Sequence, residues 1–354
     1  MSSRAAFFAV ASAFACAALV VYLASLPVPA RSPSAPPLDL GTALVSAPAA
    51  APDAPAVAAV APAAPQVPTA RAKPTAVELE AAGAILSAVL VNIICVAPPA
   101  SGVQSISGGG VIVAPAGYVL TNAHIAEYFL LADRGVACTL RAGAPARPAY
   151  QAELAYLPAA WMRDNAGVIA QPTPLGTGER DFALLAITAS RAHAELPTRF
   201  PYVALARAES RAETPVVIGT YGAQALSTQQ IESSLVPTIV AGSVEGVLTF
   251  GTSTVDFLAL GGSVAAQEGS SGGGVLGFDG TLSGLVTTST ATGPYASREL
   301  SAISAPYIRR EYMAQTGEPL DTLLSRAPAE AVALFVPQAR TLEAQYLSTL
   351  LPKR

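Results

Sequence analysis

Apolar and polar positions divide this chain into four segments of different character. The first is a mostly apolar run without a charged residue over residues 5–26, which follows Arg4 and is closed by Pro27. Its 22 residues would span roughly 33 Å as a helix, enough to cross a hydrocarbon core of about 30 Å. A secretory apolar region is usually shorter. We therefore expect residues 1–26 to be an uncleaved signal-anchor that forms a transmembrane helix, with cleavage near Ala30 as the alternative.

Residues 27–75 form the second segment, in which large apolar residues are scarce. They contain 12 Pro and 16 Ala in 49 positions. This composition cannot bury enough surface to offset the entropy of ordering the chain, so we expect a disordered linker. Because Arg4 keeps the amino terminus in the cytoplasm, all that follows the apolar run is expected to be extracytoplasmic, either periplasmic or extracellular. The protein is then membrane-anchored, or secreted if the first segment is cleaved.

The third segment, residues 76–305, has the pattern of a folded domain. A helical pattern over residues 77–90 is followed by short β-rich runs between Gly and Pro, a spacing typical of an all-β barrel or sandwich. In the fourth segment, residues 306–354, the pattern is helical. The predicted strands are 91–96, 110–113, 118–121, 137–140, 183–187, 215–219, 238–240, 247–250, 275–276 and 282–288, and the predicted C-terminal helices are 303–314, 319–325 and 337–351.

Composition excludes several classes of function. Only 12% of the 354 residues are charged and the net charge is −4, so the chain cannot neutralise a run of phosphates and is not expected to bind nucleic acid. It has two His and no C-x-x-C pair, which argues against zinc fingers and multi-histidine metal sites. We expect neither a metal nor a cofactor.

Three local motifs carry candidate chemistry. His124 ends the second of two apolar strands joined by a Pro-Ala-Gly turn, in the stretch GGGVIVAPAGYVLTNAH. Asp181 leads directly into an apolar strand, DFALL, and Ser271 lies in a Gly-Ser cluster, GSSGGGV. Each motif alone is more typical of a core residue, a turn or a flexible loop than of a catalytic group.

The three motifs in the order His, Asp, Ser, with a G-x-S-G-G loop, resemble the chymotrypsin-fold serine proteases. The stretches GYVLTNAHI, DFALL and GSSGGGVLGFDGTLSGLVT are similar to the bacterial HtrA/Deg-like branch, over about residues 88–305. The resemblance implies two antiparallel six-stranded β-barrels with the active site between them. It also implies a serine endopeptidase acting on polypeptides through an acyl-enzyme. The PDZ modules usual in that branch are not expected, because about fifty residues are too few for one.

The resemblance implies a role for each group of the triad. A serine hydroxyl is too basic to attack an amide unaided, so Ser271 needs a neighbouring base. His124 is the candidate base, since the other histidine, His193, lies in a charged segment that is typical of a solvated turn. Asp181 would hold the His124 tautomer and stabilise its protonated form. Of the adjacent serines 270 and 271, only Ser271 has both the preceding and following glycines that the family frame requires.

The resemblance also assigns the groups around the nucleophile. The backbone N–H groups of Gly269 and Ser271 would form the oxyanion hole. Ser270 stands where digestive proteases carry Asp, so activation by clipping of the N-terminus is not expected. The base of the S1 pocket falls at Ala265, which carries no charge, and we expect cleavage after small or medium aliphatic residues. The expected wall of that pocket is Leu285, Val286 and Thr287.

Cys95 and Cys138 lie in two different predicted strands of an exported chain. We expect a disulfide between them, with two buried free thiols as the alternative. Its loop of 43 residues would contribute about 4 kcal/mol on the chain-entropy model.

Two questions remain open at this point: whether the fold is catalytically active, and where the terminal helices pack. The chain could be a catalytically inactive protease fold that serves as a binding module of the cell envelope. An esterase is disfavoured because such chains usually carry the G-x-S-x-G motif in a strand–turn–helix elbow and have the order Ser-Asp-His, and neither pattern is found here. The terminal helices could either pack back on the barrels or mediate oligomerisation.

Overall fold

The computed structural model describes residues 73–171, 178–192, 194–251, 253–288, 293–294 and 298–350. All of them belong to one compact unit, Pro68–Arg354. The expected membrane segment, nearly all of the expected linker and His193 lie outside the described residues. In the part of the chain that is described, no helix combines the length and apolarity needed to cross a bilayer.

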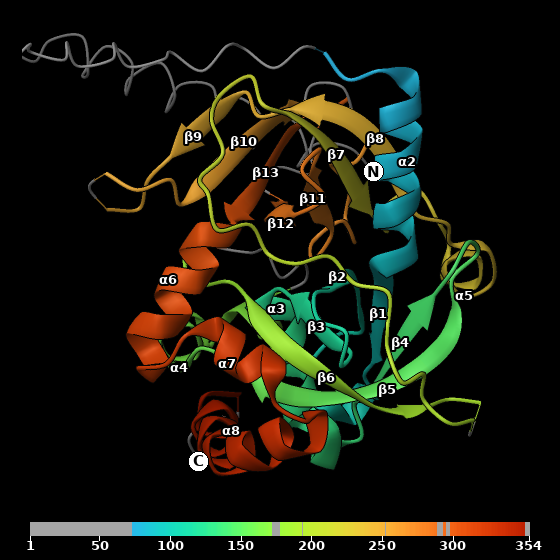
Figure 1. Ribbon diagram of the computed structural model, residues 1–354. Helices are drawn as coiled ribbons and strands as arrows, with labels where there is room; N and C mark the ends of the chain where they lie inside the picture. The colour runs from blue at the N-terminus through green and yellow to red at the C-terminus, as the bar shows by residue number, and fades with distance from the viewer. Residues whose placement is uncertain are drawn as a thin grey trace, which may run out of the picture. The chain divides into compact units, whose positions relative to one another are not determined.

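The N-terminal half of this unit is a closed antiparallel barrel of six strands, as expected, in the order β1-β2-β3-β6-β5-β4. It forms the teal and green part of Figure 1. The helix before it was predicted almost to the residue, and it begins at a capping box in which Thr75 and Glu78 each bond to the other's backbone. The elements are α2 (Ala76–Val89), β1 (Leu90–Val96), η1 (Pro99–Ser101), β2 (Ile106–Ile112), β3 (Tyr118–Thr121), α3 (Ala123–Ala126), η2 (Glu127–Arg134), β4 (Ala137–Ala142), β5 (Arg147–Tyr156), α4 (Ala159–Asn165), η3 (Val168–Ala170) and β6 (Ala183–Ser190).

The second half is a curled sheet of seven strands, so the expectation of a second closed six-stranded barrel was wrong. The strand order is β8-β7-β11-β12-β13-β10-β9. The chain bends at Val244, whose N–H bonds to Thr214, and at Glu245, whose N–H bonds to Ala259. The backbone therefore exchanges its partner β7 for β10 at this bend, which lies between the two strands predicted at 238–240 and 247–250. The elements are β7 (Pro215–Thr220), α5 (Thr228–Ser234), β8 (Thr238–Ser243), β9 (Gly246–Leu248), β10 (Phe257–Gly262), β11 (Gly274–Gly277), β12 (Leu282–Thr288) and β13 (Glu299–Ser304).

Three helices follow, as expected: α6 (Ala305–Thr316), α7 (Leu320–Ser325) and α8 (Pro328–Leu350). The last one begins nine residues before the predicted range and continues through Pro337. An internal proline costs about 3 kcal/mol. Here the cost is offset by a buried stripe at helical spacing that runs past the proline, comprising Ala331, Phe335, Leu342 and Tyr346.

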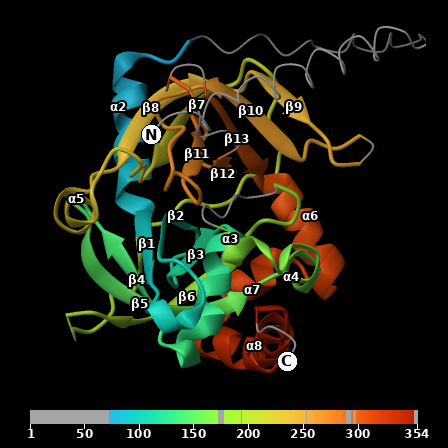
Figure 2. The same ribbon diagram turned by 180° about the vertical axis from the view of Figure 1, so that it is seen from behind.

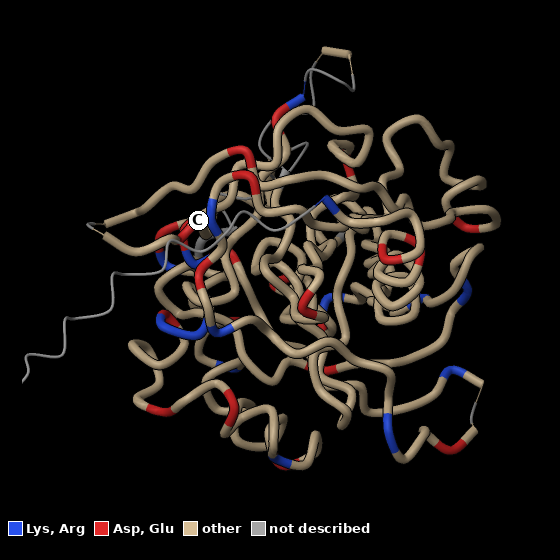
Figure 3. Tube along the Cα trace, turned by 45° about the horizontal axis from the view of Figure 1, so that its top comes forward, with Lys and Arg blue, Asp and Glu red and all other residues tan. Residues whose placement is uncertain are grey.

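The C-terminal helices pack on both halves of the unit. Helix α8 packs on β5, β6 and η2, and α6 packs on β12 and β13. Figure 2 shows the same arrangement from behind, with the red α8 beside the green barrel. Of the two alternatives left open by the sequence, packing back on the barrel is therefore the one observed within this chain. Charged positions are sparse, and both signs are interspersed along the described trace (Figure 3).

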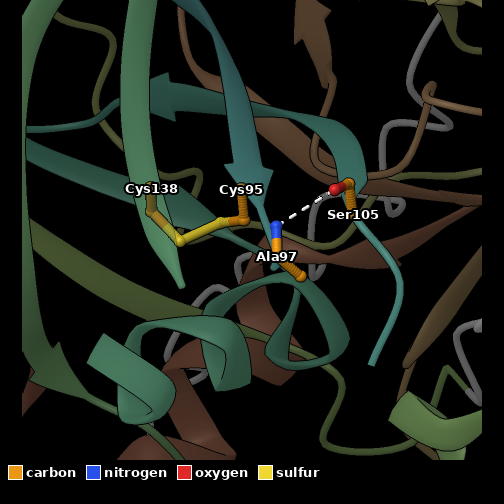
Figure 4. Close-up of a disulfide and its surroundings, with 4 residues drawn as sticks. All are labelled: Cys95, Ala97, Ser105 and Cys138. Carbon is orange, nitrogen blue, oxygen red and sulfur yellow. Dashed lines mark hydrogen bonds between the residues drawn. A yellow bond between two sulfur atoms is a disulfide. The ribbon is translucent and has the colours of Figure 1, made fainter. Parts of the chain in front are cut away.

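Cys95 and Cys138 form the expected disulfide, which joins neighbouring strands of the barrel. The two residues are directly paired in the β1–β4 ladder, and their Cα atoms lie 4.0 Å apart. Beside them the N–H of Ala97 donates to Ser105 Oγ at 3.0 Å, which ties the end of β1 to the approach of β2 (Figure 4).

Candidate active site

His124 is placed by the end of strand β3. The strand stops at Thr121, and the chain turns into the single-turn helix α3 that carries His124. The ring is 2% exposed, and its Nδ1 lies 2.9 Å from Oδ2 and 3.1 Å from Oδ1 of Asp181. The backbone N–H of His124 also donates to Asp181 Oδ1, at 3.0 Å. One carboxylate thus holds both the ring and the backbone of this residue.

Strand pairing explains how Asp181 reaches His124 across 57 residues of chain. Strands β3 and β6 are antiparallel neighbours with Thr121 opposite Ala183. The residues just after β3 and just before β6 therefore meet at the same edge of the barrel. Asn122 strengthens this junction because its Nδ2 donates to the backbone carbonyl of Asp181 at 2.8 Å. The sequence placed Asn122 in the motif but assigned it no role.

The loop of Ser271 has a backbone that only glycine accommodates at two positions. Gly269 and Gly272 have φ values of 87° and 85°, in the left-handed region. At Gly272 a Cβ would also lie 1.9 Å from the carbonyl oxygen of Gly109 in strand β2. The N–H of Gly109 in turn donates to the carbonyl of Ser271 at 2.7 Å. The serine loop is therefore hydrogen-bonded to the barrel that carries His124.

Two glycines of β2, Gly108 and Gly109, allow other segments to approach the strand closely. A Cβ at Gly109 would approach the backbone N of Gly273 to 3.1 Å. One at Gly108 would collide with Ile125 Cδ1, the residue after His124, at 2.3 Å. The same two glycines therefore admit the serine loop and the histidine helix to one place. The sequence showed the glycine run, but its role depends on contacts between distant segments.

The two adjacent serines have different surroundings. Ser270 is 0% exposed, and its Oγ accepts the N–H of Gln267 at 3.3 Å and lies 3.4 Å from Thr220 Oγ1. Ser271 is only partly buried. A substrate can therefore approach the hydroxyl of Ser271, whereas that of Ser270 belongs to the core.

The residues expected to shape the S1 pocket are all buried. Ala265 packs in the core of the second sheet. On β12 the alternating side chains of Leu285 and Val286 enter the main core and the second core respectively. Thr287 is 2% exposed, and its Oγ1 has no hydrogen-bond partner among the described residues. The side chains of Leu285 and Val286 on β12 therefore pack in the two hydrophobic cores.

Sequence reasoning missed a further carboxyl group beside the site. Glu127 follows His124 by three residues and is 0% exposed. Burial raises its pKa well above the usual range; the hydroxyl of Tyr346 acts in the opposite direction, and the charge of Asp181 adds to the increase. An acidic residue within the apolar stretch HIAEYFLLA was the available signal. Over the described ranges, no group of three or more His, Cys, Asp or Glu side chains is placed to hold a metal ion.

Residues 108–285, half of the chain, match the family described as trypsin-like peptidase domain. Among solved structures the chain is similar to the active form of the Rv3671c protease from M. tuberculosis, at 17% identity and a TM-score of 0.43, over 70% of this chain and 91% of that one. It is also similar to the inactive form of a serine-to-alanine mutant of that protease, at 16% identity and a TM-score of 0.41, over 70% and 96%. Among curated proteins none matches.

Proposed function

The chain belongs to the trypsin-like peptidase domain family and is a serine endopeptidase, and from this premise we propose that His124, Asp181 and Ser271 form its catalytic triad. The observation that carries the proposal is the buried carboxylate of Asp181, which faces the Nδ1 of His124 with both oxygens and accepts its backbone N–H. This environment favours the tautomer with the proton on Nδ1. The Nε2 atom is then the base.

The proposed reaction passes through an acyl-enzyme. Ser271 Oγ attacks the carbonyl carbon of the scissile peptide bond while His124 Nε2 takes its proton, and His124 then gives this proton to the leaving amine. Water deacylates the serine by the same route in reverse. Asp181 stays ionised throughout and stabilises the imidazolium.

We assign the oxyanion hole to the backbone N–H groups of Gly269 and Ser271. The carbonyl of Ser271 accepts the N–H of Gly109 and the N–H of Gly272 donates to Val286, and these bonds hold the backbone of the loop on both sides of the serine N–H. Gly269 has a left-handed backbone, with φ of 87°, which a residue with a side chain rarely adopts. Donors held in this way contribute about 3–4 kcal/mol each to the stability of the tetrahedral intermediate.

For specificity we propose cleavage after small or medium aliphatic residues. Ala265, expected at the base of the pocket, and its neighbour Ala266 are fully buried and carry no charge to attract Lys or Arg. A peptide-library profile should be dominated by Ala, Val or Leu before the cleaved bond. A profile dominated by Lys and Arg would overturn this preference.

We further propose that the enzyme is membrane-anchored with its catalytic domain outside the cytoplasm. The apolar run over residues 5–26 supports an anchor, and the Cys95–Cys138 disulfide suits an oxidising compartment. Protease added outside intact cells should then digest the catalytic domain, whereas a cytoplasmic control protein should survive.

Labelling with a fluorophosphonate tests the triad. The detergent-solubilised full chain should react, and Ser271→Ala should abolish the labelling because the attacking oxygen is gone. Ser270→Ala is the matched control and should keep most of the labelling, since its hydroxyl is buried against Thr220. If Ser271→Ala is still labelled, or if the unaltered chain is not, the proposed triad is wrong.

A further inference from the structure

Arg298 is a buried cation that joins three segments of the second sheet. It stands directly before β13 and is 7% exposed. Its Nε donates to the carbonyl of Gly293 at 3.0 Å, and its Nη1 donates to the carbonyl of Ala266 at 3.1 Å. Nη1 also donates to Oε1 of Gln224, in the segment after β7. A planar guanidinium presents donors in a rigid fork, which suits several acceptors at fixed positions.

Two of these three segments form the support of the serine loop. The N–H of Ala223, beside Gln224, donates to the carbonyl of Glu268 at 2.8 Å. A Cβ on Gly269 would lie 3.0 Å from the carbonyl oxygen of Tyr221, so the loop is in close contact with this segment. Ala266 directly precedes the turn that contains Gly269, which is closed by the N–H of Ser270 donating to the carbonyl of Gln267 at 3.0 Å. Arg298 therefore holds both the start of the serine loop and the segment on which that loop rests.

The residue before Ser271 supplies no charge to order this loop. Ser270 is neutral, and its hydroxyl makes only contacts of 3.3 Å to the Gln267 N–H and 3.4 Å to Thr220. Hydrogen bonds from a charged donor are about twice as strong as those between neutral groups. The bonds that Arg298 donates to Ala266 and Gln224, in contrast, come from an ionised group.

We propose that Arg298 is a positioning residue for the oxyanion hole: its guanidinium holds the Ala266–Gln224 support so that the N–H groups of Gly269 and Ser271 converge on the reacting oxygen. This inference rests on the proposed function of Ser271. Loss of the guanidinium would leave the buried carbonyl of Ala266 and the partly buried amide oxygen of Gln224 without this donor, and the segment from Ala266 to Gly269 would relax to find others.

The test compares Arg298→Ala with the unaltered chain by fluorophosphonate labelling over a range of probe concentrations. We expect the maximum labelling rate to fall about 100-fold, the size of effect seen when one oxyanion donor is lost. The half-saturating probe concentration should change much less. Arg298→Lys, which keeps a charge but not the fork, should lie between the two. Circular dichroism and thermal unfolding report whether each variant is folded.

Chemical rescue separates positioning from a merely structural role. Ethylguanidinium at millimolar concentration should restore at least about one tenth of the rate lost in Arg298→Ala, by occupying the same three acceptors. Sodium chloride at equal ionic strength should not. The matched control is Arg326→Ala, which removes an arginine paired with Glu318 at 2.7 Å, outside the serine-loop support, and should neither slow labelling nor respond to ethylguanidinium.

Three outcomes would overturn the proposal. The first is an unchanged labelling rate in Arg298→Ala. The second is a loss of rate that matches the loss of folded protein and is not rescued by ethylguanidinium. The third is an equal acceleration of Arg326→Ala by ethylguanidinium. Failure of the proposed function looks different, because the unaltered chain would then not be labelled at Ser271 at all.

Discussion

At the scale of single residues, both the carboxylate and the backbone carbonyl of Asp181 make hydrogen bonds to neighbouring residues. Oδ1 of Asp181 accepts the backbone N–H of His124, and both carboxylate oxygens face Nδ1 of the His124 ring. The backbone carbonyl of Asp181 accepts a hydrogen bond from Nδ2 of Asn122. Since the carboxylate is 0% exposed, water does not compete for these bonds. The ring of His124 therefore has one preferred orientation and one preferred tautomer.

Asp181→Asn keeps the shape of this site and removes its charge. An amide can donate to Nδ1, so it favours the tautomer in which Nε2 carries the proton and no longer acts as a base. We expect the maximum labelling rate, or kcat on a peptide substrate, to fall about 10⁴-fold at neutral pH. The exposed Asp279→Asn serves as the control and should keep the full rate. A loss of less than about tenfold would show that Asp181 does not orient the base.

At the scale of elements, strand β1 connects the parts of the first barrel. It pairs with β2 on one side and with β4 on the other, and the disulfide from Cys95 to Cys138 closes the second pairing covalently. β2 carries the glycines that meet the serine loop. The position of the catalytic loop therefore depends on a ladder that begins at β1.

Removing the disulfide should lower the stability of the whole barrel. Cys95→Ser with Cys138→Ser frees a closed loop of 43 residues in the unfolded chain, which should reduce the free energy of unfolding by about 4 kcal/mol. Urea denaturation followed by tryptophan fluorescence measures this difference, because Trp161 is buried. Cys16→Ser should leave the midpoint unchanged. Equal midpoints for all three proteins would mean that the disulfide contributes nothing to stability.

At the scale of the whole molecule, the C-terminal helix α8 packs on β5, on β6 and on η2, the helix that follows the turn of His124. Its Tyr346 covers Glu127, and neither oxygen of that carboxyl group has a hydrogen-bond partner among the described residues. Burial is also the main reason that the pKa values of Tyr128 and Tyr346 are raised, and the nearby Glu127 raises both further. Burial therefore favours the protonated, uncharged form of the Glu127 carboxyl group, which lies near the charge of Asp181.

Glu127 should make the folded state less stable as the pH rises. Unfolded, its carboxyl ionises near 4.5, whereas the pKa in the folded state is raised well above that value. Below about pH 4.5 the carboxyl is protonated in both states, so it adds no pH dependence to the free energy of unfolding. Above that pH the folded state keeps a proton that the unfolded state releases, and the free energy of unfolding falls. Glu127→Gln removes this cost, so its advantage over the unaltered chain should grow by about 1.4 kcal/mol per pH unit from about pH 4.5 up to the raised pKa.

Urea denaturation at pH 4, 6 and 8 checks this dependence. Glu330→Gln, at an exposed position of α8, is the control, and its difference from the unaltered chain should stay nearly constant. An advantage of Glu127→Gln that is the same at all three pH values would mean that Glu127 is ionised in the folded protein.

Some elements were predictable because their determinants are local. The helix Ala76–Val89 and the strand Tyr118–Thr121 follow from nearby signals, a capping pair in one case and a Pro-Ala-Gly turn in the other. The sequence predicted separate strands on either side of Val244 and Glu245, but the change of partner from β7 to β10 at this bend was not predictable, because it depends on which strands the chain reaches on either side. Nor was the start of α8 before Pro337, since only burial against the barrel offsets an internal proline.

What the sequence determined by itself is the chemistry: a histidine, a carboxylate and a serine, each in a segment whose turn and glycine residues give it a defined local backbone. Tertiary structure alone decided which of these groups meet. Pairing of β3 with β6 brings Asp181 to His124, and the glycines of β2 admit the loop of Ser271. The physical reason is that turns and caps arise between neighbours in sequence, whereas contact across 57 residues arises from strand pairing and burial.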